Sequence, residues 1–123
     1  MSIKDILLVD DNFIARMAIR KLIDKRSWQI DEASSGLDSL KRLREKNYDL
    51  IFLDLNMPDL DGVGVLEYLN EQNKMTNVII TTAMVNESNS EEVLGLGARA
   101  ILTKPVEEEK LNLVIDSLEF EVS

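Results

Sequence analysis

The sequence predicts an α/β fold built on a five-stranded, doubly wound parallel sheet. Five short apolar runs alternate along the chain with five segments of helical character, which is the rhythm of repeated strand–helix units. Two of the runs, 50–53 and 78–80, are continuously apolar and do not alternate with polar residues. Continuous runs of this kind are typical of strands that are buried on both faces of a parallel sheet.

The apolar runs set the expected strands in chain order. We expect strands at residues 6–9, 29–33, 50–53, 78–82 and 99–102. The second is the weakest of the five. If residues 29–33 do not form a strand, the fold is an α+β arrangement instead.

Apolar stripes at helical spacing predict four of the five helices. The stripes are Ile14, Met17, Ala18 and Leu22; Leu37, Leu40 and Leu43; Val65, Leu66 and Leu69; and Leu111, Val114, Ile115 and Leu118. The remaining segment, about residues 88–96, is the poorest helix candidate because Asn, Ser and Gly are frequent in it. Its apolar residues that can be buried are Val93, Leu94 and Leu96. We expect residues 120–123 to form a short frayed end.

Length and composition favour one domain that covers residues 1–123. Domains commonly have about 100–150 residues, and this chain has 123 residues, of which 45% are hydrophobic and 30% charged. The formal net charge of −9 argues against direct binding to nucleic acid or to anionic membranes. The absence of cysteine excludes disulfides and thiolate metal sites, and the absence of histidine excludes an imidazole acid–base relay or a phosphohistidine.

The sequence also predicts where the protein is found. No stretch approaches the run of about 18 apolar residues that spans a bilayer. The N-terminal Met-Ser-Ile-Lys-Asp lacks the basic and then apolar plan of a signal peptide. We therefore expect a cytoplasmic location.

Polar residues follow the predicted strands at the edge where open α/β sheets bind their ligands. Asp10 and Asp11 follow the first strand, and Asp54 follows the third. Thr82 and Lys104 follow the apolar cores of the fourth and fifth. A single Asp at such a place can equally be a helix cap, but three carboxylates in one crevice repel one another, by roughly 4 kcal/mol for two charges about 4 Å apart at an effective dielectric of about 20. A cation relieves that repulsion, and oxygen ligands without His or Cys suit Mg²⁺ or Mn²⁺.

Asp54 is placed to act as a nucleophile toward phosphorus. A carboxylate can form an aspartyl phosphate, and in-line transfer needs charge neutralisation around the phosphoryl oxygens more than it needs an acid or a base. A divalent cation at the three acids, the ammonium of Lys104 and the hydroxyl of Thr82 would supply that neutralisation. The absence of histidine is therefore no obstacle to this chemistry.

Five sequence blocks together resemble the receiver domain of two-component response regulators. The blocks are Val9-Asp10-Asp11, the run Asp-Leu-Asn-Met-Pro-Asp-Leu-Asp-Gly at 54–62, Thr82-Ala83, Gly97-Ala98 and Thr103-Lys104-Pro105. They occur in order, and the resemblance covers essentially the whole chain. It implies a flavodoxin-like sheet of strand order 2-1-3-4-5 with five helices.

The resemblance also implies a role for each matching residue. Asp54 would be the phosphoryl acceptor, Lys104 would pair with the phosphoryl group, and Thr82 would be the switch hydroxyl. The metal ligands would be Asp10, Asp11, Asp54 and the backbone carbonyl of Asn56. The bond from Lys104 to Pro105 would be cis, and Gly62 would provide backbone freedom at the start of the third helix. Such a domain catalyses only its own phosphorylation and dephosphorylation, and we expect no other enzyme activity.

Charge is distributed unevenly along the chain. Residues 12–26 carry five basic residues and one acidic residue, a net +4, and residues 106–123 carry six acidic residues and one basic residue, a net −5. Solvated helix faces account for such charge equally well. The resemblance implies that the first helix docks a histidine kinase or a histidine phosphotransfer protein, which must supply the phosphoryl group because this chain has no histidine. It also implies that the fourth and fifth helices bind a protein output target, whose identity the sequence does not give.

Ile101 departs from the receiver pattern, in which an aromatic residue three positions before the lysine turns inward with the switch hydroxyl. A receiver with an atypical or phosphate-independent switch, acting as an interaction module, is therefore the alternative function. A second alternative is an Mg²⁺-dependent phosphohydrolase with an aspartyl nucleophile. Such enzymes usually carry Asp-x-Asp at the nucleophile, and here Asn56 stands in place of the second Asp.

Overall fold

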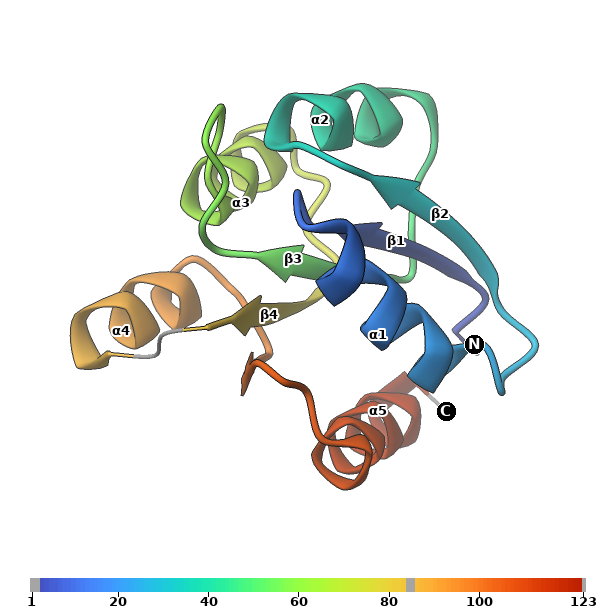
Figure 1. Cartoon of the computed structure of the whole chain (residues 1–123). Helices are drawn as coiled ribbons and strands as arrows, with labels where there is room; N and C mark the ends of the chain where they lie inside the picture. The colour runs from blue at the N-terminus through green and yellow to red at the C-terminus, as the bar shows by residue number, and fades with distance from the viewer. Residues whose placement is uncertain (1–2, 84–85, 123) are drawn as a thin grey trace.

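All five predicted strands are present in the computed structural model of the chain, which describes residues 3–83 and 86–122 (Figure 1). The strands are β1 (Asp5–Val9), β2 (Gln29–Ala33), β3 (Leu50–Asp54), β4 (Asn77–Thr82) and β5 (Ala100–Thr103). The helices are α1 (Phe13–Ile23), α2 (Gly36–Glu45), α3 (Gly62–Glu71), α4 (Glu87–Gly95) and α5 (Glu108–Val122). The strands form one parallel sheet in the order β2-β1-β3-β4-β5, which confirms the predicted fold class and strand order.

The weak second strand forms because it lies at an edge of the sheet. β2 pairs only with β1, in a register that runs from Asp5 opposite Gln29 to Val9 opposite Ala33. An edge strand has one hydrogen-bonded neighbour and keeps part of its surface in solvent, so its polar side chains need not be buried. β3, in the middle of the sheet, is buried at every residue, which accounts for its continuous apolar run.

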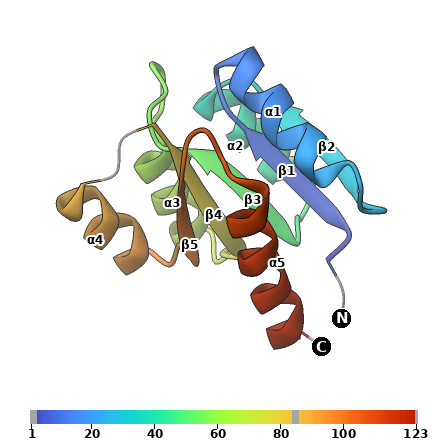
Figure 2. The same cartoon turned by 60° about the horizontal axis from the view of Figure 1, so that its bottom comes forward.

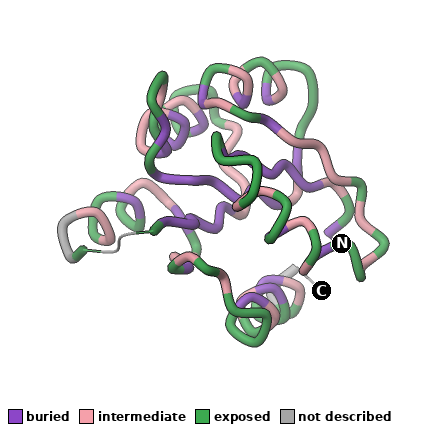
Figure 3. The backbone as a smooth tube through the Cα atoms, viewed as in Figure 1, coloured by how far each residue is buried: buried purple, intermediate pink, exposed green. Residues whose placement is uncertain are grey.

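Helices cover both faces of the sheet and give the chain two apolar cores (Figures 1 and 2). One core joins the sheet to α1 and α5 through side chains that include Ile6, Leu8, Phe52, Ile79, Ile19, Ile23, Leu111, Ile115 and Leu118. The other joins it to α2, α3 and α4 through side chains that include Leu7, Val9, Ile51, Leu53, Ile80, Leu43, Val65, Leu66, Leu69 and Val93. Figure 3 shows this buried backbone running through the middle of the molecule. The carboxyl ends of the strands, where the candidate site residues lie, are left at one edge.

Most of the apolar stripe predicted for the first helix does not face the sheet, although Leu22, its last member, packs against the core. Ile14 is 74% exposed and Met17 is 49% exposed, and Ala18 is exposed as well. The buried residues of α1 are instead Ile19 and Ile23. α1 has two adjacent apolar faces, and the face formed by the later residues packs against the sheet. The earlier residues therefore form an apolar stripe on the outside of the molecule.

The poorest helix candidate does form a helix, α4. Asn86 caps it, since its side chain accepts a hydrogen bond from the backbone N–H of Asn89 at 2.8 Å. Val93 is fully buried against the sheet, whereas Leu94 is 49% exposed. The cap and the burial of Val93 thus help to hold a helix whose composition is unfavourable.

Two further expectations need correction. Leu37, predicted to belong to a core stripe, is 59% exposed at the start of α2. The frayed end predicted for residues 120–123 is wrong over its described part, because α5 continues to Val122; Ser123 lies outside the described residues. None of the helices in the described part of the chain combines the length and the apolar character that a bilayer crossing requires.

Candidate functional site

Three carboxylates meet at the carboxyl edge of the sheet, as predicted. Asp10 directly follows β1 and is fully buried, and Asp54 is the last residue of β3 and is 3% exposed. Asp11 lies at the exposed rim. Each of the three offers an oxygen within 4.8 Å of the others. The strands β1 and β3 are neighbours in the sheet, so its topology brings together acids that are 43 and 44 residues apart in the sequence.

The local structure holds Asp10 in one orientation. Its N–H donates to the carbonyl of Ala33 at 3.1 Å, and its Oδ1 accepts from the N–H of Asn12 at 2.9 Å. Its carbonyl accepts from Nη1 of Arg16 at 2.7 Å. The remaining oxygen, Oδ2, is buried and lies 2.7 Å from the ammonium of Lys104, with which it forms an ion pair. A buried carboxylate oxygen with unused acceptor capacity therefore faces the pocket.

Lys104 reaches both buried acids. Its Nζ lies 2.7 Å from Asp10 Oδ2 and 3.3 Å from Asp54 Oδ1. Burial disfavours its charged form, but the hydrogen bond and the charge of Asp10, followed by those of Asp54, outweigh burial and raise the pKa of Lys104. The N–H of Lys104 donates to the carbonyl of Thr82 at 2.8 Å, and its bond to Pro105 is cis, as expected.

Asp54 has a strongly perturbed acidity. Burial and the charge of Asp10 raise the pKa of Asp54 from 3.8 to about 6, against the opposing effects of Lys104 and of the N–H of Asn56. The group is therefore mostly ionised at neutral pH and becomes protonated in mildly acidic solution. An ionised carboxylate in a water-poor pocket is a suitable nucleophile.

Thr82 and Ile101 lie at the β4–β5 side of the site. Thr82 is 1% exposed, and the side-chain amide of Asn56 donates to its hydroxyl at 3.5 Å. Thr82, Ile101 and Val93 line a small space under α4 that has no room for a water molecule. Ile101 thus fills the space beside the threonine in this structure. The backbone carbonyl of Asn56 stays a predicted metal ligand.

Gly62 serves a different purpose from the one expected. Its φ does not lie in the left-handed region, so it does not provide unusual backbone freedom. A Cβ at this position would lie 2.7 Å from the carbonyl oxygen of Asp54. The glycine therefore allows the start of α3 to approach the end of the strand that carries the candidate nucleophile.

Two side chains that support the site were missed by the sequence analysis. Arg16 holds the carbonyl of Asp10, as described above. Asp59, five residues after Asp54, accepts from the N–H groups of Gly36 at 3.2 Å and of Leu37 at 3.0 Å. These bonds tie the loop that follows β3 to the start of α2. The partners of Asp59 are 22 and 23 residues away in the sequence, so no local spacing pattern predicts these bonds.

The donor set fits a divalent cation. Asp10, Asp11 and Asp54 offer hard oxygen ligands, and magnesium prefers carboxylate and carbonyl oxygens over nitrogen and sulfur. The buried Oδ2 of Asp10, which is ion-paired with Lys104 but keeps further acceptor capacity, is the observation in this structure that favours a cation in the pocket. Receiver domains generally bind Mg²⁺ in an acidic pocket of this kind.

Comparisons with known proteins agree with the geometry. The family model of the response regulator receiver domain matches residues 6–116. The chain is 34% identical over 113 residues to the transcriptional regulatory protein ResD of Bacillus subtilis, a match that covers 92% of this chain and 47% of ResD. It is 34% identical over 114 residues to the transcriptional regulatory protein SrrA of Staphylococcus aureus, covering 93% of this chain and 47% of SrrA. The chain therefore spans about half the length of these relatives.

Solved structures show the same architecture. The receiver domain of the Francisella response regulator 1452 matches with a TM-score of 0.85 and 30% identity, over 98% of this chain and 99% of that one. The chemotaxis protein CheY4 of Vibrio cholerae matches with a TM-score of 0.85 over 95% of this chain and 99% of that one; at 22% identity it shows the fold alone. The chain belongs to the family of receiver domains of two-component response regulators, whose general function is that of a phosphorylation switch.

Proposed function

We propose that Asp54 accepts a phosphoryl group from a histidine kinase or a histidine phosphotransfer protein, and that the change is passed to the surface of α4 and α5. The observation that carries this proposal is the position of the Asp54 carboxylate, which is 3% exposed, clustered with Asp10 and Asp11, and 3.3 Å from the Lys104 ammonium. A nucleophile, a cation site and a fixed positive charge are the parts that phosphoryl transfer requires. A cytoplasmic location belongs to the same proposal.

The proposed step needs no acid or base from this chain. A carboxylate oxygen of Asp54 forms a bond to phosphorus while the bond from phosphorus to the donor imidazole nitrogen breaks, and the electron pair leaves with that nitrogen. With a pKa of about 6, Asp54 is already ionised at neutral pH. Lys104 is placed to contact an oxygen of the transferred group, because its ammonium lies 3.3 Å from Asp54 Oδ1. The chain acts only on itself in this scheme, in phosphorylation and in dephosphorylation.

Four groups would hold the cation, namely Asp10, Asp11, Asp54 and the backbone carbonyl of Asn56. Bound Mg²⁺, or Mn²⁺ in its place, would neutralise charge on the phosphoryl oxygens. The phosphohydrolase alternative is less well supported, because Asn56 offers no carboxyl group to act as a general acid after the nucleophile.

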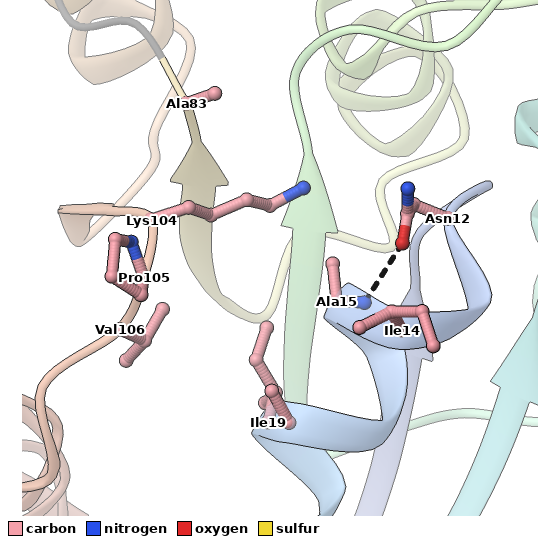
Figure 4. Close-up of a pocket in the computed structure, with 9 residues that line it drawn as sticks. Asn12, Ile14, Ala15, Ile19, Ala83, Lys104, Pro105 and Val106 are labelled. Carbon is pink, nitrogen blue, oxygen red and sulfur yellow. Dashed lines mark hydrogen bonds between the residues drawn. The ribbon is translucent and has the colours of Figure 1, made fainter.

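An apolar hollow beside Lys104 supports docking through α1. The cavity has a volume of about 510 Å³, and its lining includes Ile14 and Ala15 of α1 as well as Pro105 and Val106 after β5. Figure 4 shows these two groups on opposite sides of the hollow, with the Lys104 side chain extending across one end. Ile14 is 74% exposed, so the α1 side is open to a partner. A helix carrying phosphohistidine could lie in this hollow with its imidazole directed toward Asp54.

The charges of α1 and of the residues just after it contribute less to docking than the sequence suggests. Arg16 and Arg20 are paired with Glu32, and Arg26 is paired with Glu119. An internally paired cation offers little attraction to an acidic partner. The exposed apolar residues of α1 are therefore the main part of the proposed donor surface.

Output through α4 and α5 is supported by the packing next to Thr82. Thr82 and Ile101 both line the small space under α4, so an inward movement of the threonine hydroxyl changes what α4 packs against. Leu94 on α4 is 49% exposed and is available to a target protein. The same observation favours the alternative of an atypical switch, in which Ile101 replaces the usual aromatic residue and only the threonine and α4 respond.

Incubation with acetyl phosphate, with and without Mg²⁺, tests the proposal by intact mass. The wild-type chain should gain one phosphoryl group when Mg²⁺ is present and none with a chelator. Asp54→Asn should gain none, and Glu71→Gln, an exposed change on α3, should behave as the wild type. Absence of labelling in the wild type under all donors would favour the phosphate-independent module instead.

A further inference from the structure

The side chain of Arg16 contacts the backbone of the acid pocket, at Asp10, and not a carboxylate of the cluster. Its Nη1 donates to the carbonyl of Asp10 at 2.7 Å, and its Nε donates to Glu32 Oε1 at 2.7 Å. The Arg16 side chain is only 13% exposed, although arginine side chains mostly lie in solvent. One guanidinium therefore joins the residue at the end of β1, the candidate metal ligand Asp10, to the edge strand β2.

Glu32 keeps that guanidinium in place. Its carboxylate accepts one hydrogen bond from Arg16 and another from Arg20 on the next turn of α1. The planar guanidinium of Arg16 has several donors in a fixed arrangement, so it can satisfy Glu32 and the Asp10 carbonyl at once. The pairing with Glu32 also compensates the positive charge of Arg16, which would otherwise compete with a cation at the three acids.

As a result, both backbone polar groups of Asp10, a candidate metal ligand, are held by hydrogen bonds. The N–H of Asp10 is bound by Ala33, and its carbonyl is bound by Arg16. Its Oδ1 is bound by the N–H of Asn12, so Oδ2 is the oxygen left facing Asp54 and Lys104. Ligands oriented by surrounding hydrogen bonds bind metal more tightly, because less ordering is needed when the ion arrives.

We propose that Arg16 is a positioning residue for the divalent cation, holding the Asp10 peptide so that its carboxylate points into the pocket, with Glu32 as its anchor. The inference rests on the Mg²⁺ site of the proposed function. It assigns to Arg16 no contact with the ion or with the phosphoryl group. Arg20 shares Glu32 but does not bind the Asp10 carbonyl, so it provides a matched control.

Calorimetric titration of the metal-free full chain with MgCl₂, without a phosphoryl donor, tests this role. Arg16→Gln should raise the Kd for Mg²⁺ about tenfold, the effect typical of losing a group that orients a ligand. Arg16→Lys should raise it less, because a single amine reaches either the carbonyl or Glu32 and not both. Arg20→Gln should leave the Kd within about twofold of the wild type, since the Asp10 contact is intact.

Labelling with acetyl phosphate at increasing Mg²⁺ gives a second readout. A positioning role predicts that Arg16→Gln needs more Mg²⁺ but reaches the wild-type labelling rate at saturation. A lower rate at saturation would show that Arg16 acts on the reaction itself, which would overturn the assignment. Thermal unfolding in a chelator establishes whether each variant is folded. If Arg16→Gln does not fold, the Mg²⁺ affinity of Arg16→Lys alone tests the positioning role.

The outcomes separate this inference from the proposed function. An unchanged Kd in the Arg16 variants would overturn the inference even if the wild type is phosphorylated. An equal loss of affinity in Arg20→Gln would also overturn it, because the effect would then come from the freed charge of Glu32. A wild-type chain that binds Mg²⁺ and loses affinity in Arg16→Gln, but is never phosphorylated, would support the inference and refute the proposed function.

Discussion

Replacing Asp54 by Asn should stabilise the chain at neutral pH, by an amount that depends on pH. Burial and the charge of Asp10 raise the pKa of Asp54 from 3.8 to about 6. A carboxyl group with a higher pKa in the folded state favours folding while it is protonated, and this contribution is lost as the pH rises through the folded pKa. Asn has nearly the same shape and no charge, so it avoids the cost of ionising Asp54 in the pocket.

The size of the effect follows from the pKa difference. A shift of about two pKa units corresponds to about 3 kcal/mol. Solvent reaches the pocket at its rim, where Asp11 is exposed, and screens the charge. We therefore expect Asp54→Asn to raise the free energy of unfolding by about 1–2 kcal/mol at about pH 8, and to leave it nearly unchanged at about pH 3, where Asp54 is largely protonated in both the folded and the unfolded state.

Urea unfolding over this pH range, in a chelator, measures the difference. The single tryptophan, Trp28, packs against the core between the sheet and α5 and reports unfolding by fluorescence. Glu71→Gln removes one negative charge from the exposed surface of α3 and controls for net charge. The reasoning is refuted if the stability difference between Asp54→Asn and the wild type does not grow from about pH 4 to about pH 7, or if Glu71→Gln reproduces it.

Three other measurements follow from the site. Mg²⁺ at about 100 times its Kd should stabilise the wild type by about 2.7 kcal/mol and should stabilise Asp10→Asn far less, as thermal unfolding with and without the ion will show. Gly62→Ala should lower the free energy of unfolding by about 1–3 kcal/mol, because its Cβ would lie 2.7 Å from the Asp54 carbonyl oxygen; an unchanged urea midpoint would contradict that contact. Hydrogen bonds from backbone N–H groups, that of Leu37 first among them, lower the pKa of Asp59 below 3.8. The ionised carboxylate therefore stabilises the fold, and Asp59→Ala should lower the melting temperature at neutral pH. That loss should disappear as the pH falls below 3.8 and through the lowered pKa, and a pH-independent loss would show that the carboxylate charge is not responsible.

The sheet was predictable because most of its strands are marked by apolar runs in their own sequences. Residues 50–53 are apolar without interruption, and β3 is buried along its whole length. β2 was harder, since only Ile30 and Ala33 among its residues are apolar. Its place at the edge, next to β1, is a property of the whole sheet that the five residues themselves do not encode.

The helix faces were only partly predictable. Periodicity identified α1, but it did not show which of two adjacent apolar faces packs on the sheet. Ile19 and Ile23 take that role, while Ile14 and Met17 remain in solvent. In α3 the apolar residues form a single face, and the predicted residues Val65, Leu66 and Leu69 are all buried. A stripe predicts burial reliably only where the helix has one apolar face.

The acids of the site were predictable because the topology of a parallel sheet gathers the ends of neighbouring strands. The side chains that hold these acids and the neighbouring loop in place could not be predicted. Arg16 and Glu32 are 16 residues apart, and Asp59 is 23 residues from Gly36. Each of these contacts depends on how a helix turns over the sheet, which a periodic pattern does not specify. The same limit applies to the net +4 of residues 12–26, most of whose charge is used in ion pairs within the chain.

The pairing of charges around the pocket determines which ion can complete it. Three clustered carboxylates meet one contacting ammonium, that of Lys104, which leaves two formal negative charges uncompensated. Arg16 lies beside Asp10, but its charge is paired with Glu32 and does not reduce this excess. A divalent cation supplies both missing charges at once, whereas a monovalent ion supplies only half of them. We therefore expect a preference for a divalent ion that depends on the Arg16–Glu32 pair as well as on the acids that would bind the ion.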